Sequence, residues 1–277
     1  MAYIELQCNL FPQEPTADII TAQLAEIGFE SFAESDSGIL AYIKEEDFDF
    51  EKVKTLDIVS SDLFEISFEY SKLEDRNWNA VWESNYDPVT IADKCYIRAP
   101  FHPERNDVDY QILIEPQMSF GTAHHETTAL MIEYLLDADC SGKVVMDMGC
   151  GTGVLAVLAE LKGAADIVAI DNDVWAYRNT VENVKKNSCE KIVVIHGDAT
   201  NIPEKSYDIF IANINKNILL NDIADYSKVI HSGGTLFLSG FYKHDIVDIR
   251  KEADRCGFDY VEFRNKNDWV AVSFIKR

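Results

Sequence analysis

The sequence of 277 residues lacks long apolar runs and paired cysteine motifs, and it has 25 basic side chains against 48 acidic ones. No uninterrupted apolar stretch approaches the ~18 residues that span a membrane. The first residues hold neither a basic segment nor the apolar core of a signal peptide. The six cysteines are scattered without a C-x-x-C pair, which argues against zinc and disulfide frameworks. These absences predict a cytoplasmic protein with reduced thiols and no membrane partner.

Basic residues are scarcest at the start of the chain. Residues 1–70 contain 16 acidic and 3 basic side chains, against 32 and 22 in residues 71–277. A negative field of this kind disfavours nucleic acid as a direct partner and attracts a basic protein. Acidity that only maintains solubility is the alternative explanation. We expect the chain to be a monomer.

The most informative motif is a glycine-rich segment that starts at Val144 and reads V-V-M-D-M-G-C-G-T-G. Its glycines, Gly149, Gly151 and Gly153, allow a sharp turn and a close approach of the backbone to a ligand. The helix predicted after them would direct its N-terminal N–H groups toward that ligand. Asp171 follows the first glycine by 22 residues, near the ~20-residue spacing at which an acid meets ribose hydroxyls.

Two details of this motif favour S-adenosylmethionine over NAD as the ligand. The glycines run G-x-G-x-G, whereas a dinucleotide fingerprint reads G-x-G-x-x-G. Asp147, near the end of the first strand, would suit the ammonium group of an amino-acid moiety and would repel a pyrophosphate. A glycine turn that only caps a helix is the alternative.

The rest of the C-terminal region predicts an α/β fold, because strands and helices alternate there and alternation is typical of a parallel sheet. The chain ends on a hairpin, which is unlike an NAD-binding domain and matches the seven-stranded, Rossmann-like sheet of class I methyltransferases. Strands are predicted over 144–148, 167–170, 192–196, 209–212, 235–239, 260–264 and 269–274, and helices over 127–136, 154–161, 174–186, 218–229 and 245–256.

The N-terminal region reads as strand, helix, hairpin, helix and strand, the ferredoxin-like βαββαβ order. The segments are 3–10, 15–28, 29–34 with 39–43, 49–59 and 63–70. We therefore divide the chain into a ferredoxin-like recognition domain (1–72), a linker region (73–116) with one or two short strands, and a methyltransferase domain (117–277). Trp78 and Trp82 in the linker share one helical face, either for core packing or for substrate contact.

Polar residues follow two further predicted strands, at the sheet edge where ligands bind in parallel sheets. Asp198 would either accept a hydrogen bond from an adenine amino group or cap the next turn. Asn213, followed by Ile214, ends the fourth strand, and its amide can orient an amine for attack on a sulfonium methyl. We therefore assign Asn213 and Ile214 as the catalytic candidates.

Several segments resemble the ribosomal protein methyltransferase family PrmA, whose members modify protein L11 of the large subunit. The resemblance covers most of the chain and implies transfer of methyl groups from S-adenosylmethionine to lysine side chains or the N-terminal amine of L11. It also implies cofactor contacts at Thr128, Gly149, Asp171 and Asn213. The segments are F-G-T-A-H-H-E-T-T at 120–128, W-N-A-V-W at 78–82, D-P-V-T-I at 87–91, I-E-P at 114–116, the glycine segment and A-N-I at 212–214.

Two segments depart from the family pattern, and both are expected beside the acceptor entrance. They are Ala123–Glu126, where the family usually has Gly-Thr-His-Pro, and Asn215–Asn217, which replace small or apolar residues. The pair His124 and His125 suggests a metal, but with only Glu126 nearby we favour hydrogen-bonded loop histidines and expect no metal.

Other functions remain open at the level of the sequence. The acceptor could be another protein or a small molecule. Glutamine of a release factor is a further candidate, but enzymes of that kind usually show Asn-Pro-Pro-Tyr after the fourth strand, and this chain has Asn-Ile-Asn. A cofactor-binding scaffold without catalysis is the alternative from another class.

Overall fold

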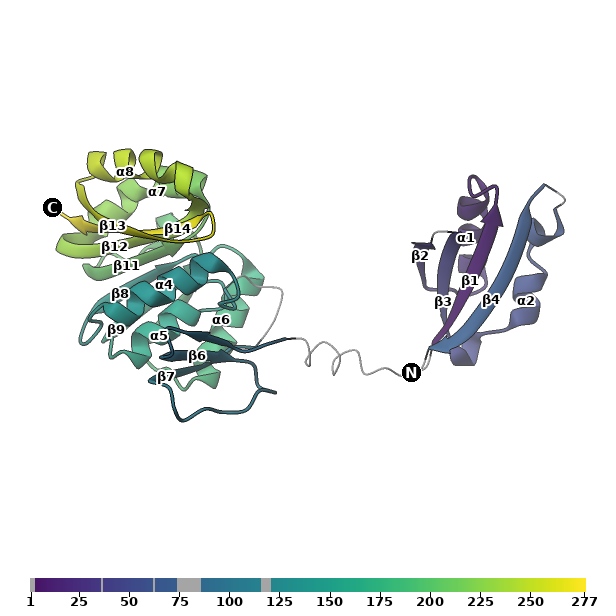
Figure 1. The fold of residues 1–277 in the computed structure, drawn as a ribbon, viewed down its shortest axis with the longest axis horizontal. Helices are drawn as coiled ribbons and strands as arrows, with labels where there is room; N and C mark the ends of the chain where they lie inside the picture. The colour runs from purple at the N-terminus through teal and green to yellow at the C-terminus, as the bar shows by residue number, and fades with distance from the viewer. Residues whose placement is uncertain (1–2, 36, 62, 74–85, 116–120) are drawn as a thin grey trace. The chain divides into compact units, whose positions relative to one another are not determined.

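The computed structural model describes residues 3–35, 37–61, 63–73, 86–115 and 121–277. The chain divides into two compact units, residues 1–86 and 87–277, and each is described by itself (Figure 1). Trp78, Trp82, Pro116 and Phe120, which the sequence singled out, lie outside the described residues. None of the helices in the described ranges is long and apolar enough to cross a membrane.

The first unit has the predicted ferredoxin-like order, with four strands in one antiparallel sheet arranged β2-β3-β1-β4. Side chains of β1 alternate between buried and more exposed positions, so that Leu6 and Cys8 face Ile20 and Leu24 of α1 in one core. The elements are β1 (Tyr3–Phe11), α1 (Thr16–Glu26), β2 (Ser31–Ser35), β3 (Gly38–Lys44), α2 (Phe50–Lys54) and β4 (Glu65–Leu73).

The second helix of this unit is shorter than the predicted range 49–59. It ends at Lys54, and a separate 3₁₀ turn covers Asp57–Ser60. The hydroxyl of Thr55 donates to the carbonyl of Lys52 at 2.9 Å, a local bond that competes with continuation of the helix.

The second unit contains a seven-stranded sheet in the order β10-β9-β8-β11-β12-β14-β13. The first five strands in this order are parallel, and β14 runs antiparallel between β12 and β13. This is the predicted class I methyltransferase sheet. Its elements are α4 (Glu126–Asp137), β8 (Val144–Met148), α5 (Val154–Leu161), β9 (Asp166–Asp171), α6 (Val174–Lys186), β10 (Ile192–His196), β11 (Tyr207–Asn213), α7 (Lys216–Val229), β12 (Ile230–Tyr242), α8 (Ile246–Arg255), β13 (Phe258–Lys266) and β14 (Trp269–Lys276).

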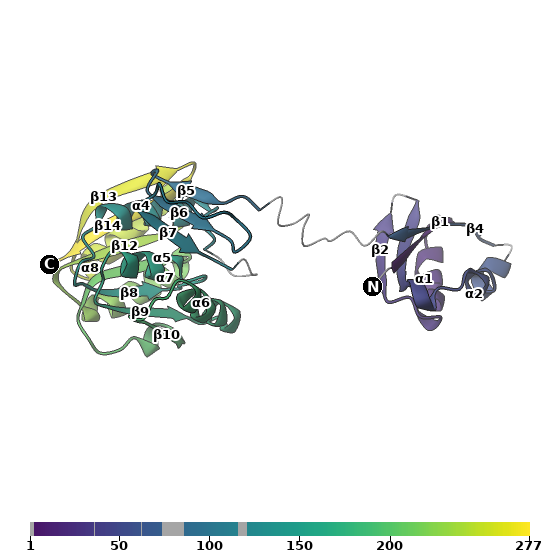
Figure 2. The same cartoon turned by 90° about the horizontal axis from the view of Figure 1, so that it is seen from below.

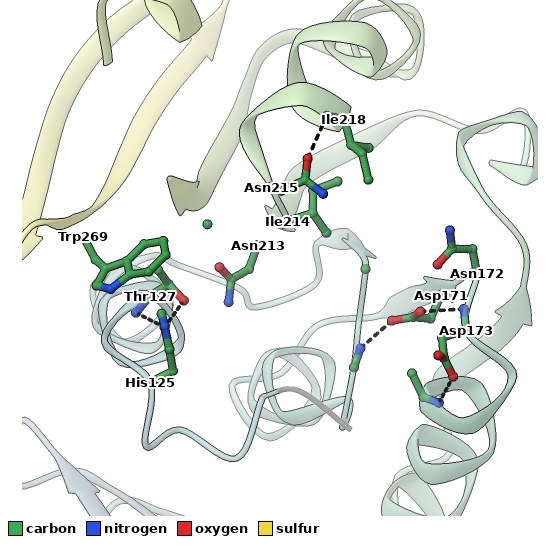
Figure 3. Close-up of a pocket in the computed structure, with 14 residues that line it drawn as sticks. His125, Thr127, Asp171, Asn172, Asp173, Asn213, Ile214, Asn215, Ile218 and Trp269 are labelled. Carbon is green, nitrogen blue, oxygen red and sulfur yellow. Dashed lines mark hydrogen bonds between the residues drawn. The ribbon is translucent and has the colours of Figure 1, made fainter. Parts of the chain in front are cut away.

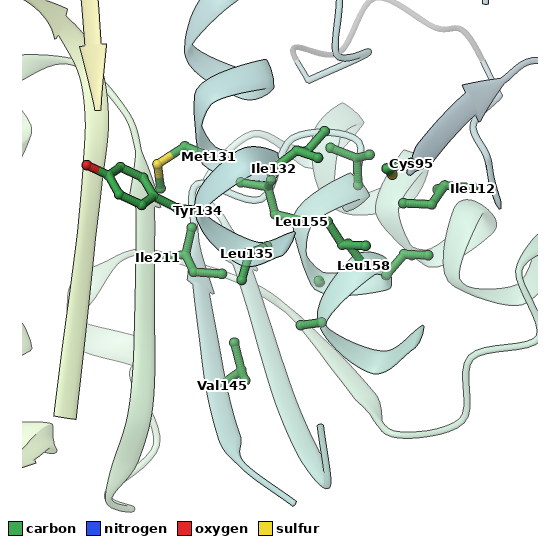
Figure 4. Packing of buried hydrophobic residues seen from close by; sticks show 14 of the residues in the cluster. Cys95, Ile112, Met131, Ile132, Tyr134, Leu135, Val145, Leu155, Leu158 and Ile211 are labelled. Carbon is green, nitrogen blue, oxygen red and sulfur yellow. The ribbon is translucent and has the colours of Figure 1, made fainter. Parts of the chain in front are cut away.

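Helices cover both faces of this sheet. On one face, α4 and α5 pack against the strands through residues such as Leu135, Leu155, Val145 and Ile211 (Figure 4). On the other face, α7 and α8 bury a second cluster that includes Phe210. The central strands are buried on both faces, which is why they read as nearly continuous apolar runs in the sequence.

Three short strands precede the large sheet, where the sequence predicted one or two. They are β5 (Val89–Ile91), β6 (Cys95–Arg98) and β7 (Tyr110–Leu113), paired as one sheet. These strands lie beside α4 and α5 (Figure 2), and Cys95 and Ile112 belong to the same core cluster as residues of those helices (Figure 4). Asn187, which directly follows α6, also bonds both the N–H and the carbonyl of Leu113. Residues 89–115 are therefore built into the second unit.

Candidate active site

A cavity of about 510 Å³ opens at the carboxyl edge of the parallel strands. Because neighbouring parallel strands end at the same edge, Gly149 after β8, Asp171 of β9 and Asn213 of β11 meet there. Figure 3 shows Asp171 on one side of the cavity and Trp269 on the other, with Asn213 between them. Five of the predicted site residues line this cavity, namely Gly149, Gly151, Asp171, Asn213 and Ile214.

The glycine loop is packed against Ile214. Gly149 has a φ of 72°, and a Cβ placed on it would lie 2.2 Å from Cγ2 of Ile214. Ile214 is confined from its other side by Gly240, where a Cβ would lie 2.3 Å from the carbonyl oxygen of Ile214. Only glycine leaves room at both positions. Ile214 is thus wedged between the turn after β8 and the bulge in β12.

Asp171 fixes the other half of the loop. Its carboxylate accepts from the N–H of Gly151 at 2.8 Å and from the N–H of Asp173 at 2.9 Å. The residue is 9% exposed and lines the cavity. An ionised carboxylate has about four lone-pair sites, so two backbone bonds leave acceptor capacity toward the cavity.

Gly153, for which we predicted contact with the ligand, has a structural role at the start of α5, and the ligand contact stays a prediction. It caps α5 with a φ of 80°, and a Cβ there would lie 2.8 Å from Cγ2 of Thr180 on α6. The residue is outside the cavity lining. Its lack of a side chain allows α5 and α6 to pack closely behind the loop.

The position of Asp147 does not support the predicted contact with an ammonium group. Its side chain is 1% exposed and lies outside the cavity lining, where it accepts from the N–H of Ala156 at 3.1 Å. Along β8 the side chains alternate, so Asp147 shares the α5 side of the sheet with Val145. Burial, opposed in part by the Ala156 hydrogen bond, raises the pKa of Asp147 to about 7.

Asp198 caps the next turn, as the alternative interpretation held. Its carboxylate accepts from the N–H of Thr200 at 2.9 Å and from the hydroxyl of Thr200 at 2.6 Å, and these bonds lower the pKa of Asp198. The residue also borders a small cavity of about 60 Å³ that shares Gly149 and Asp171 with the main one. A contact with a nucleoside base therefore stays a prediction.

Asn213 presents a polar atom without a partner. Its Nδ2 donates to the hydroxyl of Thr128 at 3.3 Å, which places Thr128 behind the cavity wall. Its Oδ1 is buried and has no hydrogen-bond partner within the described residues. A buried acceptor of this kind is costly unless a ligand satisfies it. Asn213 lines the cavity and therefore carries an acceptor that a bound ligand could satisfy.

The histidines before α4 are hydrogen-bonded in their loop. His125 Nδ1 accepts from the N–H of Thr127 at 3.3 Å and thereby caps α4. The ring of His124 bonds the hydroxyl of Thr122 at 3.1 Å and the carbonyl of Asp87 at 2.8 Å. The described residues contain no group of three or more His, Cys, Asp or Glu suited to a metal.

Several lining residues were missed by the sequence reasoning. Trp269 begins β14, and because that strand runs antiparallel, its start lies at the edge where the parallel strands end. Gly240 gave no signal, since it lies within a long strand. Asn172 and Asp173 directly follow Asp171, so their place in the chain could have revealed them. His125 and Asn215 belong to the two departing segments and do line the cavity.

A Rossmann-like sheet with a reversed strand, and a glycine loop lining a cavity at its carboxyl edge, make up the class I methyltransferase fold. A family model described as Ribosomal protein L11 methyltransferase (PrmA) matches residues 14–277. The chain belongs to this family.

Relatives that carry this name are similar to the chain over all or nearly all of its length. A Phocaeicola vulgatus protein named Ribosomal protein L11 methyltransferase is 44% identical over 282 residues, covering 100% of both chains. A Porphyromonas gingivalis protein of the same name is 45% identical over 264 residues, covering 94% of this chain and 91% of its own. The crystal structure of ribosomal protein L11 methylase from Lactobacillus delbrueckii subsp. bulgaricus shares the fold, with a TM-score of 0.63 and 22% identity over 69% of this chain and 100% of that one.

The close packing of Ile214 against Gly149 predicts that Gly149→Ala weakens cofactor binding more than a comparable change elsewhere. The added Cβ would collide with Ile214, so the variant should lose about 1–3 kcal/mol of stability through overpacking and should bind S-adenosylmethionine at least about tenfold more weakly, as measured by isothermal titration. The matched control is Gly142→Ala. Gly142 has a φ of 70°, and a Cβ placed on it would meet nothing within 4 Å, so only the left-handed strain of about 1–2 kcal/mol applies. Equal cofactor affinity in the two variants would show that the packing of Ile214 against Gly149 does not matter for cofactor binding.

The buried carboxyl of Asp147 predicts a pH-dependent stability. Its pKa is raised from 3.8 to about 7 in the folded protein, so the folded state holds a proton that the unfolded chain releases. The contribution of Asp147 to the free energy of unfolding is therefore most favourable below pH 3.8, and it is lost as the pH rises from 3.8 to about 7. Asp147→Asn keeps an acceptor for Ala156 and removes the titration, so its advantage over the wild type should grow between pH 5 and 7, by up to about 1.4 kcal/mol per pH unit. Urea unfolding at several pH values measures this.

The control for Asp147→Asn is Asp109→Asn, since Asp109 is exposed. The free energy of unfolding of Asp109→Asn should change with pH in the same way as that of the wild type. If Asp147→Asn also follows the wild type, the carboxyl does not titrate in this window.

Proposed function

We propose that the chain transfers methyl groups from S-adenosylmethionine to amines of ribosomal protein L11, on lysine side chains or the N-terminal amine. The observation that carries the proposal is the unpartnered Oδ1 of Asn213 in a cavity of a chain that matches the L11 methyltransferase family over residues 14–277. Relatives that bear this name align over the whole chain.

The groups that line the cavity suit the chemistry of the cofactor. Gly149 and Gly151 expose backbone to the cavity, and the Asp171 carboxylate is held beside them to accept from ribose hydroxyls. Asp198 borders the adjoining small cavity and is the proposed adenine contact. S-adenosylmethionine, when bound, supplies a methyl group already activated on a sulfonium. The protein therefore has mainly to hold and align the two reactants.

The acceptor amine enters, in this proposal, between Asn213 and Trp269. A lysine amine has a pKa of about 10.4 in water and has to lose its proton before it can act as a nucleophile. The apolar surface of Ile214 and the ring of Trp269 line this part of the cavity and favour the neutral amine. Asn213 Oδ1 accepts one of its N–H groups and so directs the nitrogen lone pair. Alignment of this kind can supply about 7–11 kcal/mol.

The acidic first unit is proposed to bind the basic substrate protein. The uncovered face of its sheet carries Glu5 of β1 and Glu65 and Glu69 of β4, which the strand register places on the same side. Lys44 of β3 is opposite Tyr3 and lies on the same side, so this face carries an excess of acidic groups over basic ones. Such an excess steers a partner of the opposite sign. The free thiols of all six cysteines support a reducing compartment, and we propose that the enzyme acts in the cytosol as a monomer without direct contact to nucleic acid.

Asn213→Ala should lower kcat for L11 about 100-fold, because the amine loses its alignment. The assay incubates purified L11 with the enzyme and methyl-labelled cofactor and counts label in the protein. Asn217→Ala, an exposed change two residues into α7, is the matched control and should retain wild-type kcat. A wild-type kcat in Asn213→Ala would remove Asn213 from the mechanism.

Neutralising the acidic face should weaken substrate recognition alone. The triple change Glu5→Gln, Glu65→Gln and Glu69→Gln should raise the KM for L11 and reduce its dependence on salt, with cofactor affinity unchanged. A triple control changes three exposed glutamates elsewhere on the unit by the same charge, namely Glu14, Glu26 and Glu46. Equal KM values in the two triple variants would show that the face has no specific role.

A further inference from the structure

An ion-pair cluster stands behind the acceptor side of the cavity. Lys216 Nζ lies 2.7 Å from Oδ1 of Asp245 and 2.7 Å from Oδ2 of Asp248. Lys216 opens α7 directly after the lining residues Asn213–Asn215, whereas Asp245 and Asp248 lie at the start of α8. The cluster therefore ties the end of β11 to the segment that follows β12.

This cluster differs from an ordinary surface ion pair. The side chain of Asp245 is 10% exposed and that of Lys216 is 28% exposed, so solvent screens the contact less than it screens most surface pairs. The hydrogen bonds with Asp245 and Asp248 raise the pKa of Lys216, which keeps the ammonium charged. Lys216 directly follows Asn215, which caps the N-terminus of α7 and lines the cavity.

Contacts lead from Asp245 to the wall of the cavity. Asp245 Oδ2 accepts from the N–H of Tyr242 at 3.1 Å. Tyr242 and Trp269 are partners across β12 and β14, and their ring centroids are 4.2 Å apart. Trp269 in turn meets the ring of His125, with centroids 4.7 Å apart, and both line the cavity (Figure 3). Rings in such contact resist independent movement.

We propose that Lys216 is a positioning residue for the methyl acceptor. By holding Asp245, and through it Tyr242 and Trp269, it sets the separation between the Asn213 side and the aromatic side of the cavity. The proposal rests on the proposed function, in which the acceptor amine enters between these two sides. The ion pairs of the cluster join Lys216 to Asp245 and Asp248, whereas Asp171 bonds the glycine loop on the cofactor side.

The test compares Lys216→Met with Lys228→Met in the full chain. Lys228 lies on the same helix and pairs with Asp225 at 2.5 Å, but its side chain is 72% exposed. Lys216→Met should lower kcat for L11 about tenfold through misalignment, with the dissociation constant for S-adenosylmethionine within about twofold of the wild type. Lys216→Arg, which can bond both carboxylates, should restore most of the kcat. Lys228→Met should match the wild type.

A second measurement is independent of activity. The indole N–H resonance of Trp269, assigned with a Trp269→Phe variant, should shift in Lys216→Met and stay in place in Lys228→Met. An unshifted resonance, or equal kcat in the two methionine variants, would overturn the proposal. A loss of cofactor affinity as large as the loss of kcat would also overturn it, since Lys216 would then act on the other side. If the wild type labels no L11 but binds the cofactor, the proposed function fails, and the resonance still decides the role of Lys216.

Discussion

The position of Ile214 between two glycines is the constraint on which the site depends. Gly149 leaves room for the side chain of Ile214, and Gly240 leaves room for its backbone. The ends of the neighbouring strands β8, β11 and β12 are therefore held at a fixed separation. Interiors are packed closely enough that such contacts do not adjust gradually. The glycine loop is thus held as much by the strand beside it as by its own turn.

The cavity beside Ile214 has two chemically different sides. On one side, Asp171 is fixed by two backbone N–H groups and retains acceptor capacity for a ligand with hydroxyl groups. On the other, Trp269 and His125 form an aromatic wall, and Asn213 offers a buried acceptor between the two. A methyl donor and an amine bound at these sides would meet at Asn213, which is the arrangement that direct displacement requires.

Much of this arrangement could be predicted from the sequence, because parallel strands deliver their carboxyl ends to one edge. The glycines, Asp171 and the pair Asn213–Ile214 follow from that rule, and the reversed last strand follows from the terminal hairpin. Trp269 could not be found in this way, since the rule does not cover an antiparallel strand that begins at the same edge.

Two of the predicted cofactor residues lie outside the cavity lining for local reasons, and their contact with the cofactor stays a prediction. Asp147 follows the strand alternation onto the α5 side and satisfies Ala156 there, so its nearness to the glycines in sequence did not mean nearness to the cavity. Gly153 is required for helix packing, with Thr180 as its neighbour. For Asp147 the direction of the side chain decides its surroundings, whereas for Gly153 the absence of a side chain does.

The two-sided cavity is tested most directly by a crystal structure of the full chain with S-adenosylhomocysteine. We expect the ribose hydroxyls on the Asp171 carboxylate and the sulfur directed toward Asn213 and Trp269. A ligand whose nucleoside instead lies against Trp269 and His125, leaving Asp171 without a ligand contact, would contradict it.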